Sequence, residues 1–185
     1  MHSESRRCGW CNEKNVRYVE YHDNEWGVPR WEDGYLFEML VLESFQAGLS
    51  FECILNKREN FRRAFDDFDP YKICSYTSEK LEDLYHDSGI VRNKRKICAV
   101  VENAKIFCSI VEQYGSFYNY LIGFYGGGVI YETGCVTSTL SDAISSDLFR
   151  RGMRFVGSVI IYSYLQAIGI IYSHEEGCFL FKRET

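Results

Sequence analysis

The segment SGIVRNKRKI, residues 88–97, decides the fold of this chain. A short helix capped by Ser78 is expected before it, and from about Lys94 apolar residues recur at the i, i+3/i+4 spacing of a longer helix. Gly89 is placed to end the first helix and to permit a tight turn, so the segment predicts a hairpin between two helices. The free backbone amides that open the second helix make this hairpin a candidate site for a phosphate group.

The charge balance limits which partners such a site could have. The 185 residues include 21 Lys and Arg against 26 Asp and Glu, a net charge of −5, which argues against coating nucleic acid or an anionic membrane through bulk charge. However, 11 of the 21 basic residues lie in the windows 57–63, 92–96 and 150–154, where Glu59 is the only acidic residue. Basic residues beside helix ends are common on any solvated surface. Their position around the hairpin favours contact with a DNA backbone.

Helical patterns dominate the remaining sequence. A dense apolar run predicts a buried helix from Asp33 to Gly48, and further helices are expected from Pro70 and from Ser138. Residues 115–138 lack periodicity, and their glycines predict a flexible loop. No strand pattern of comparable length occurs. The predicted fold class is therefore all-α, in one compact unit.

Residues 155–173 form an uncharged stretch of 19 residues, which is close to the length of a membrane span. Polar residues and two glycines interrupt it, so a helix buried in the protein core is the better interpretation, and no membrane association is expected. The amino-terminal sequence MHSESRRCGWC has no apolar core of a secretory signal. We therefore expect a cytoplasmic protein, whose cysteines stay reduced or bind metal.

Four residues near the two chain ends have the composition of a metal site. His174 precedes Cys178 by four positions, and Cys8 precedes His22 by 14. Two thiolates and two imidazoles form a common tetrahedral zinc set, which would join the chain ends. Cys11 is a competing ligand in the motif CGWC. That motif could instead be a redox pair, which is the weaker interpretation because no βαβ pattern surrounds it.

Glu43 is the candidate catalytic residue. Its neighbours at i−4, i−3 and i+4 are apolar, so its carboxylate shares the buried face of the predicted helix. A buried carboxylate is costly unless it is paired, which makes such a residue a functional candidate. Two alternatives remain open: the side chain emerges near the helix end, or it pairs with an arginine. Glu38 is expected at the rim of the same region.

Aromatic residues are dense on both sides of this helix in the sequence. Aromatic faces stack on purines and hold cations through the ring quadrupole. Clustered aromatic residues are more often simply part of a core, so both interpretations stay open. The residues are Trp10, Tyr18, Tyr21, Trp26, Trp31 and Phe51.

Taken together, these segments resemble the DNA-3-methyladenine glycosylase I family of the helix-hairpin-helix DNA glycosylase superfamily. The resemblance covers nearly the whole chain. The matching stretches are RCGW at 7–10, YHDNEWGVP at 21–29, LFEMLVLESFQAGLSF at 36–51, FDP at 68–70, SGIVRNKRKI at 88–97, RFVGSVIIYSYLQAIG at 154–169 and HEEGC at 174–178.

The resemblance implies a helix-hairpin-helix glycosylase fold with one structural zinc site. It divides the chain into zinc-binding terminal segments (1–30 and 170–185) and a helical domain (31–169). The implied reaction is hydrolysis of the N-glycosidic bond of 3-methyladenine in alkylated duplex DNA by base flipping, which leaves an abasic site without a lyase step. The protein is expected to act as a monomer. The implied zinc ligands are Cys8, His22, His174 and Cys178.

Roles follow by matched position. Glu43 corresponds to the base-recognising carboxylate, and the Gly48-Leu49 turn corresponds to the segment that enters the space left by the flipped base. The implied substrate-binding residues are Trp10, Tyr18, Tyr21, Trp26 and Phe51. The implied DNA contacts are Gly48, Leu49, Gly89, Arg92, Lys94 and Lys96.

The chain departs from the family pattern at a few positions. Phe51 stands where the family usually has Trp, which predicts a smaller stacking surface, and Cys11 is an added thiol beside a zinc ligand. Most helix-hairpin-helix glycosylases carry a catalytic Asp after the hairpin, but residues 88–141 contain none. Glu43 is therefore expected to act as an electrostatic partner of the base rather than as a general base.

Overall fold

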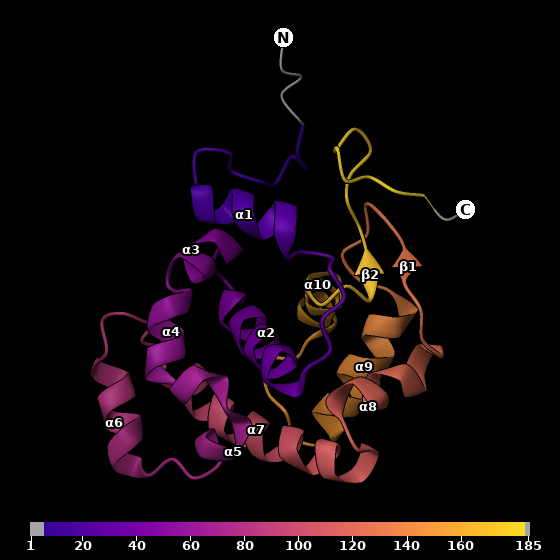
Figure 1. Ribbon diagram of the computed structural model, residues 1–185. Coiled ribbons are helices and arrows are strands. Elements are labelled where there is room, and N and C mark those ends of the chain that lie inside the picture. Colours follow the sequence, from indigo (N-terminus) through magenta and orange to yellow (C-terminus); the bar gives the residue numbers. More distant parts are fainter. Residues whose placement is uncertain (1–5, 184–185) are drawn as a thin grey trace.

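The computed structural model describes residues 6–183, which form a bundle of helices with one very short strand pair (Figure 1). The helices are α1 (Val16–Asn24), α2 (Asp33–Gln46), α3 (Phe51–Asn56), α4 (Arg58–Ala64), the 3-10 helix η1 (Asp66–Phe68), α5 (Pro70–Ile73), α6 (Ser78–His86), α7 (Lys94–Tyr114), α8 (Phe117–Tyr125), α9 (Thr139–Arg150) and α10 (Ser158–Ala167). The strands are β1 (Ile130–Tyr131) and β2 (Ile171–Tyr172).

Helix α2 lies at the centre of the molecule (Figure 1). Its residues 36–45 are all buried, so it has no solvent-facing stripe. Helices α3, α7, α8 and α10 pack against it. A helix that is apolar on every side is stable only when other elements enclose it. The dense apolar run thus correctly predicts a buried helix, which ends at Gln46, two residues before Gly48.

The predicted hairpin is confirmed. Helices α6 and α7 pack against each other and are joined by residues 87–93. Thr77 rather than Ser78 caps α6, and this helix ends at His86 rather than at Gly89. Asn93 caps α7 by accepting a hydrogen bond from the backbone amide of Lys96.

The prediction of a loop over residues 115–138 is wrong in its first half, which forms α8. Aromatic residues on every side of this short helix hide its periodicity. Its two ends did carry signals, because Ser116 is its N-cap and Gly126 ends it in the left-handed conformation at φ 82°. The Asp33 carboxylate accepts a hydrogen bond from the amide of Phe117 at 2.8 Å, so it stabilises the start of α8 instead of capping α2.

Strands β1 and β2 form a parallel ladder of two residues each, with Ile130 opposite Ile171. The all-α prediction is right for nearly all of the structure and omits this ladder. The stretch 155–173 contains α10, which is buried against α2, and then β2. None of the helices in residues 6–183 combines the length and the apolar character that a membrane span needs.

Candidate active site and metal centre

A cavity of about 200 Å³ opens beside the C-terminal half of α2. The aromatic residues predicted to bind substrate all reach this cavity, together with Glu43. Trp31 lies elsewhere, stacked on Tyr118 with a ring-centroid distance of 4.1 Å. The lining residues are Trp10, Tyr18, Tyr21, Trp26, Glu43, Gln46, Phe51, Ser163 and Gln166.

The aromatic rings contact one another around the cavity. The ring centroid of Trp10 lies 4.8 Å from that of Trp26 and 5.3 Å from that of Tyr18. Phe51 lies 5.1 Å from Tyr21 on another side. These rings belong to the core, as one interpretation expects, and they also form the wall of a cavity. Stacking on a purine stays a prediction.

Two polar atoms at this cavity lack partners. The Glu43 side chain is buried, and neither its Oε2 atom nor the hydroxyl of Tyr21 has a hydrogen-bond partner among the described residues. Burial raises the pKa of Glu43 to about 8. Burial, followed by the nearby charge of Glu43, also raises the pKa of Tyr21. Both alternatives for Glu43 are wrong: it neither emerges at the helix end nor pairs with an arginine.

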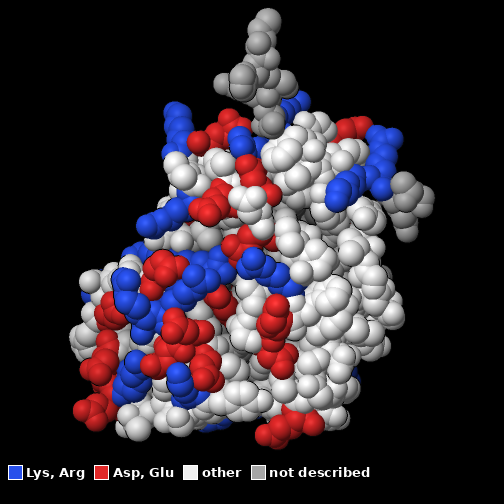
Figure 2. Space-filling model, in the orientation of Figure 1, with Lys and Arg blue, Asp and Glu red and all other residues white. Residues whose placement is uncertain are grey.

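Glu38 has the arginine pairing that was considered for Glu43. The Nε atoms of Arg58 and Arg62 donate to its Oε1 at 2.6 and 2.9 Å, and Arg58 also pairs with Glu25 at 2.8 Å. Glu38 is buried rather than at a rim, because the side chains of α4 cover it. On the left part of the face seen in Figure 2, basic and acidic residues lie intermixed.

The three basic windows are therefore not equivalent. Arg58 and Arg62 are neutralised by carboxylates outside their window, and Arg151 pairs with Asp147 at 2.7 Å. Glu59 is the only acidic residue within the windows, but the other carboxylates that pair with these arginines lie elsewhere in the sequence. In the hairpin, by contrast, three basic side chains are exposed: Arg92, Lys94 and Arg95.

Lys57, which lies between α3 and α4, and Asn60 of α4 stabilise the hairpin turn. Lys57 Nζ and Asn60 Nδ2 both donate to the carbonyl of Gly89, at 3.2 and 3.1 Å. A Cβ on Gly89 would lie 2.9 Å from Asp87 Oδ1 and 3.2 Å from Asn60 Cβ, so a larger residue would require these two side chains to shift. The amide of Gly89 donates to Asp87 Oδ1 at 2.7 Å, so this amide is already paired within the turn.

Lys96 is not a surface residue, although the sequence predicted a DNA contact there. Its side chain is buried, and its Nζ donates to the carbonyls of Phe45 at 2.8 Å and Ala47 at 2.7 Å. The reason is helical periodicity: Lys96 lies on the face of α7 that packs against α2, whereas Lys94 lies on the opposite, exposed face.

The Gly48-Leu49 turn projects from the end of α2 beside the cavity. Gly48 has φ +84°, which an L side chain rarely adopts. The Leu49 side chain is 43% exposed, which is unusual for an apolar residue next to a buried helix. Both residues are therefore at the surface, where the sequence placed them.

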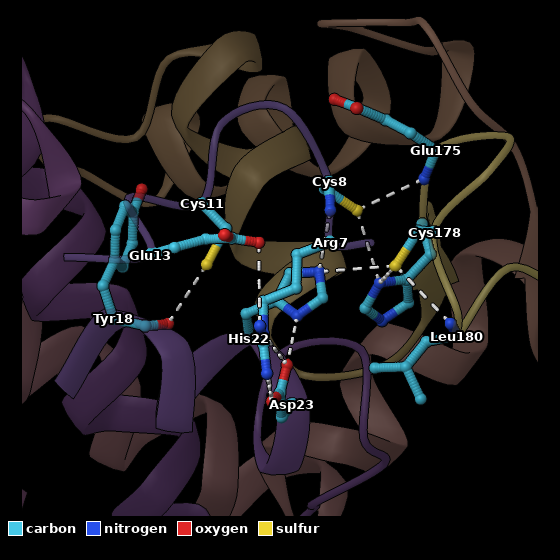
Figure 3. Close-up of polar contacts among 11 residues, drawn as sticks. Arg7, Cys8, Cys11, Glu13, Tyr18, His22, Asp23, Glu175, Cys178 and Leu180 are labelled. Atoms are coloured by element: carbon cyan, nitrogen blue, oxygen red, sulfur yellow. Dashed lines mark hydrogen bonds and ion pairs between the residues drawn. The ribbon is translucent and has the colours of Figure 1, made fainter. Parts of the chain in front are cut away.

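The four predicted metal ligands converge in one buried cluster. Their ligand atoms all lie within 4.8 Å of one another, so the cluster could hold a metal ion. Cys8 Sγ lies 3.5 Å from His174 Nδ1, and Cys178 Sγ lies 3.5 Å from His22 Nε2. Figure 3 shows how the amino-terminal segment and the C-terminal segment each supply a cysteine and come together here.

Groups around this cluster orient its ligands. Asp23 contacts His22 Nδ1 at 2.7 Å and accepts two hydrogen bonds from Arg7 (Figure 3). Backbone amides of Glu175 and Leu180 donate to the sulfurs of Cys8 and Cys178. Carboxylate–histidine pairs and amides directed at sulfur are typical of protein metal sites.

Burial sets the protonation of these ligands. Desolvation lowers the pKa of His174 to about 4, so its imidazole is neutral and able to ligate. Burial raises the pKa of Cys8 to about 12, so its thiolate needs a cation beside it. Cys11 lies outside the cluster: its thiol donates to the Tyr18 carbonyl, and burial raises its pKa to about 11. It is therefore neither a fifth ligand nor an activated redox thiol.

The sequence model of the family described as Methyladenine glycosylase matches residues 10–181. The chain belongs to this family. The DNA-3-methyladenine glycosylase 1 of Escherichia coli (strain K12) is 40% identical over 179 residues, which are 93% of this chain and 95% of that protein. A crystal structure of a 3-methyladenine DNA glycosylase I superposes with a TM-score of 0.90 at 39% identity, covering 96% of this chain and 100% of the other.

A third relative, the 3-methyladenine DNA glycosylase I of Staphylococcus aureus, was solved to explain its recognition of 3-methyladenine. It superposes with a TM-score of 0.90 at 30% identity, over 97% of this chain and 99% of the other. The methyladenine glycosylase described here is thus an enzyme, a hydrolase that acts on N-glycosyl bonds in DNA.

Three cavity residues of this methyladenine glycosylase were missed as site residues. Gln46, Ser163 and Gln166 line the cavity with their polar side chains. Ser163 and Gln166 are among the polar residues that interrupt the uncharged stretch 155–173. A polar residue on the inner face of an otherwise apolar helix was the signal that could have identified them.

Proposed function

We propose that this enzyme hydrolyses the N-glycosidic bond of 3-methyladenine in alkylated duplex DNA by base flipping, and that it leaves an abasic site without cutting the strand. It acts as a cytoplasmic monomer in base excision repair. Glu43 recognises the flipped base, within the aromatic walls formed by Trp10, Tyr18, Tyr21, Trp26 and Phe51. The relatives from Escherichia coli and Staphylococcus aureus support this choice of substrate, because both are named as 3-methyladenine glycosylases.

The observation that carries this proposal is the pair of unpartnered polar atoms in the aromatic cavity. Glu43 Oε2 and the Tyr21 hydroxyl are buried, and neither has a hydrogen-bond partner within residues 6–183. Such groups are costly to bury unless a ligand completes them. The walls suit a flat heteroaromatic ring, and the carboxylate suits one that carries positive charge and N–H donors. A purine methylated at N3 has these properties, whereas unmodified adenine is neutral.

Hydrolysis of the bond to a methylated base needs little catalytic assistance from the protein. The bond between N9 of the base and C1′ of the sugar breaks, and its electron pair neutralises the charge that methylation placed on the base. The oxygen of a water molecule bonds to C1′, and one proton is released to solvent. Because the cationic base leaves readily, the main task is to select and hold it. Ionised Glu43 does this by Coulomb attraction, and the cation in turn lowers the raised pKa of Glu43.

Access to the base requires that it leave the duplex, and a damaged base unstacks at lower cost than an intact one. Leu49 is an exposed apolar side chain next to the cavity, which suits it to fill the emptied space. Arg92 and Lys94 supply the contact with the DNA backbone, and Gly89 belongs to the turn that carries them. None of the described residues that line the cavity is a lysine, which supports hydrolysis without a Schiff-base lyase step.

Zinc is the metal we assign to the cluster of Cys8, His22, His174 and Cys178. Tetrahedral zinc with bonds of about 2.3 Å to sulfur and about 2.0–2.1 Å to nitrogen places sulfur and nitrogen ligands about 3.5 Å apart. Three of the four sulfur–nitrogen pairs lie at 3.5, 3.5 and 3.6 Å. Two thiolates balance the charge of Zn²⁺. All four ligand positions are taken by protein, so the ion has a structural role and joins the chain ends.

Chromatography of bases released from methylated duplex DNA tests the proposal. Wild type should release 3-methyladenine, and Glu43→Gln should lower the rate on the order of 10²-fold or more, since a buried electrostatic partner contributes about that much. Glu112→Gln, an exposed carboxylate on α7, is the matched control and should keep the wild-type rate. The absence of free base with wild-type protein, or an unchanged rate with Glu43→Gln, would contradict the proposal.

A further inference from the structure

The most unusual lysine of the structure is Lys96, whose ammonium group is enclosed by protein. Its Nζ donates to the carbonyls of Phe45 and Ala47, and it lies 5.9 Å from the ring of Phe45 and 5.7 Å from that of Phe155. Desolvation lowers the pKa of this group. A buried cation costs free energy, so its retention at this position calls for a reason beyond packing.

The two carbonyls that it binds belong to the end of α2. The last carbonyls of a helix lack partners within the helix, and a cation beside them is favourable because of the helix dipole. Phe45 and Ala47 flank Gln46, which lines the base cavity. The Gly48-Leu49 turn follows directly, and the Leu49 amide donates back to the Gln46 carbonyl at 2.6 Å. The ammonium therefore fixes the backbone from which Leu49 projects.

The backbone of Lys96 is part of the hairpin, whereas its side chain reaches the end of α2. Its backbone amide donates to the N-cap Asn93, so its own position is set by the first turn of α7. Arg92, Lys94 and Arg95, the exposed basic residues of the hairpin, lie within four positions of it. One side chain thus spans from the element that meets the DNA backbone to the turn that meets the emptied base position.

We propose that Lys96 is a positioning residue, which ties the hairpin to the Gly48-Leu49 turn so that backbone contact and insertion of Leu49 are made by one rigid unit. This inference rests on the proposed function. It replaces the direct DNA contact that the sequence suggested for Lys96. An apolar wedge is effective only when its position relative to the bound backbone is set in advance, because a misplacement of about 1 Å can cost on the order of 10²-fold in rate.

The test uses Lys96→Met, which keeps the length of the side chain and suits the neighbouring phenyl rings. Single-turnover base release from methylated duplex DNA should fall on the order of tenfold or more. Binding of free 3-methyladenine, measured by tryptophan fluorescence, should stay within about twofold of wild type, because the cavity is intact. Lys96→Arg, which keeps the charge and the N–H donors, should restore part of the rate.

A double-mutant cycle with Leu49→Ala separates positioning from general damage. If Lys96 acts through the wedge, Lys96→Met should cost little in a protein that already lacks Leu49. Lys94→Met is the matched control on the same turn: it should weaken DNA binding, flatten its salt dependence and combine additively with Leu49→Ala. If Lys96→Met does not fold, Lys96→Gln, whose amide keeps two N–H donors, takes its place in the cycle.

Additive effects of Lys96→Met and Leu49→Ala, an unchanged rate in Lys96→Met, or an equal loss of free-base binding would each overturn the inference. These outcomes differ from failure of the proposed function itself. In that case the wild-type protein would release no 3-methyladenine in the first place.

Discussion

The aromatic cavity and the cluster of candidate metal ligands share residues in their walls, but they differ in whether their buried polar atoms have partners. Trp10 lines the cavity and lies 5.2 Å from the ring of His22, and Trp26 lines it and lies 4.8 Å from the ring of His174. On the cavity side, two buried polar atoms have no partner in the part of the chain that the structure describes. On the metal side, four ligand atoms converge and nearby groups orient them.

The contrast shows how one small core supports two kinds of binding. A permanent ion completes its ligands when the protein folds, so its binding free energy adds to the stability of the fold. A transient substrate must find polar atoms unsatisfied, so the empty cavity carries a cost in stability. The metal centre is therefore expected to stabilise the same wall that the cavity destabilises.

The largest expected effect is loss of the metal. His174→Ala should abolish binding of one zinc ion per chain and should lower the free energy of unfolding by about 4 kcal/mol, the contribution of a ligand present at 1,000 times its dissociation constant. Elemental analysis and urea denaturation with and without a chelator measure both quantities. Cys11→Ser, which changes a buried thiol outside the cluster, should keep the metal. A wild-type protein without metal would contradict the view that a bound ion completes the cluster while the cavity stays open for a substrate.

The next effect is the pH dependence that Glu43 imposes on stability. Its pKa is raised from 4.5 to about 8 by burial, so the folded protein keeps a proton that the unfolded chain releases. This contribution to stability is fully present below pH 4.5 and is lost as the pH rises toward about 8, by up to about 1.4 kcal/mol per pH unit.

Glu43→Gln should remove this slope. Its advantage in unfolding free energy over wild type should therefore grow between about pH 5 and about pH 8. Urea denaturation across this range measures the difference, with Glu112→Gln as the exposed control. If the unfolding free energies of wild type and Glu43→Gln change in parallel with pH, the Glu43 carboxylate is solvated or paired. The cavity would then no longer differ from the metal cluster in having an unpartnered polar atom.

The smallest effect concerns the Tyr21 hydroxyl. Tyr21→Phe removes an unpartnered buried hydroxyl and should leave stability unchanged or raise it by up to about 1 kcal/mol. Tyr162→Phe is the matched control, because the Tyr162 hydroxyl is buried and donates to Glu132 at 2.6 Å, and this change should cost about 1 kcal/mol. The Tyr21 variant should also release base more slowly. Equal destabilisation of both variants would show that Tyr21 is not poised for a ligand.

Local sequence patterns predicted much of the fold and most of the site. The spacing of residues along the sequence was enough to predict α2, the hairpin and the burial of Glu43, because each depends on a pattern within one or two turns of helix. Helix α8 was missed, since its aromatic residues surround it on every side and leave no stripe. The two-residue strand pair was also missed, because so short a ladder depends on contacts between residues about 40 positions apart rather than on a pattern.

The sequence by itself determined which residues are capable of chemistry: the four metal ligands, the aromatic residues, Glu43 and the basic hairpin. Only the tertiary structure decided how the charged groups are used. Arg58 and Arg62 form ion pairs with Glu38. Glu43 Oε2 has no hydrogen-bond partner among the described residues, and Lys96 is buried against the end of α2. The reason is physical: side-chain type and spacing are local properties, whereas the partner of a charge is set by packing between distant helices.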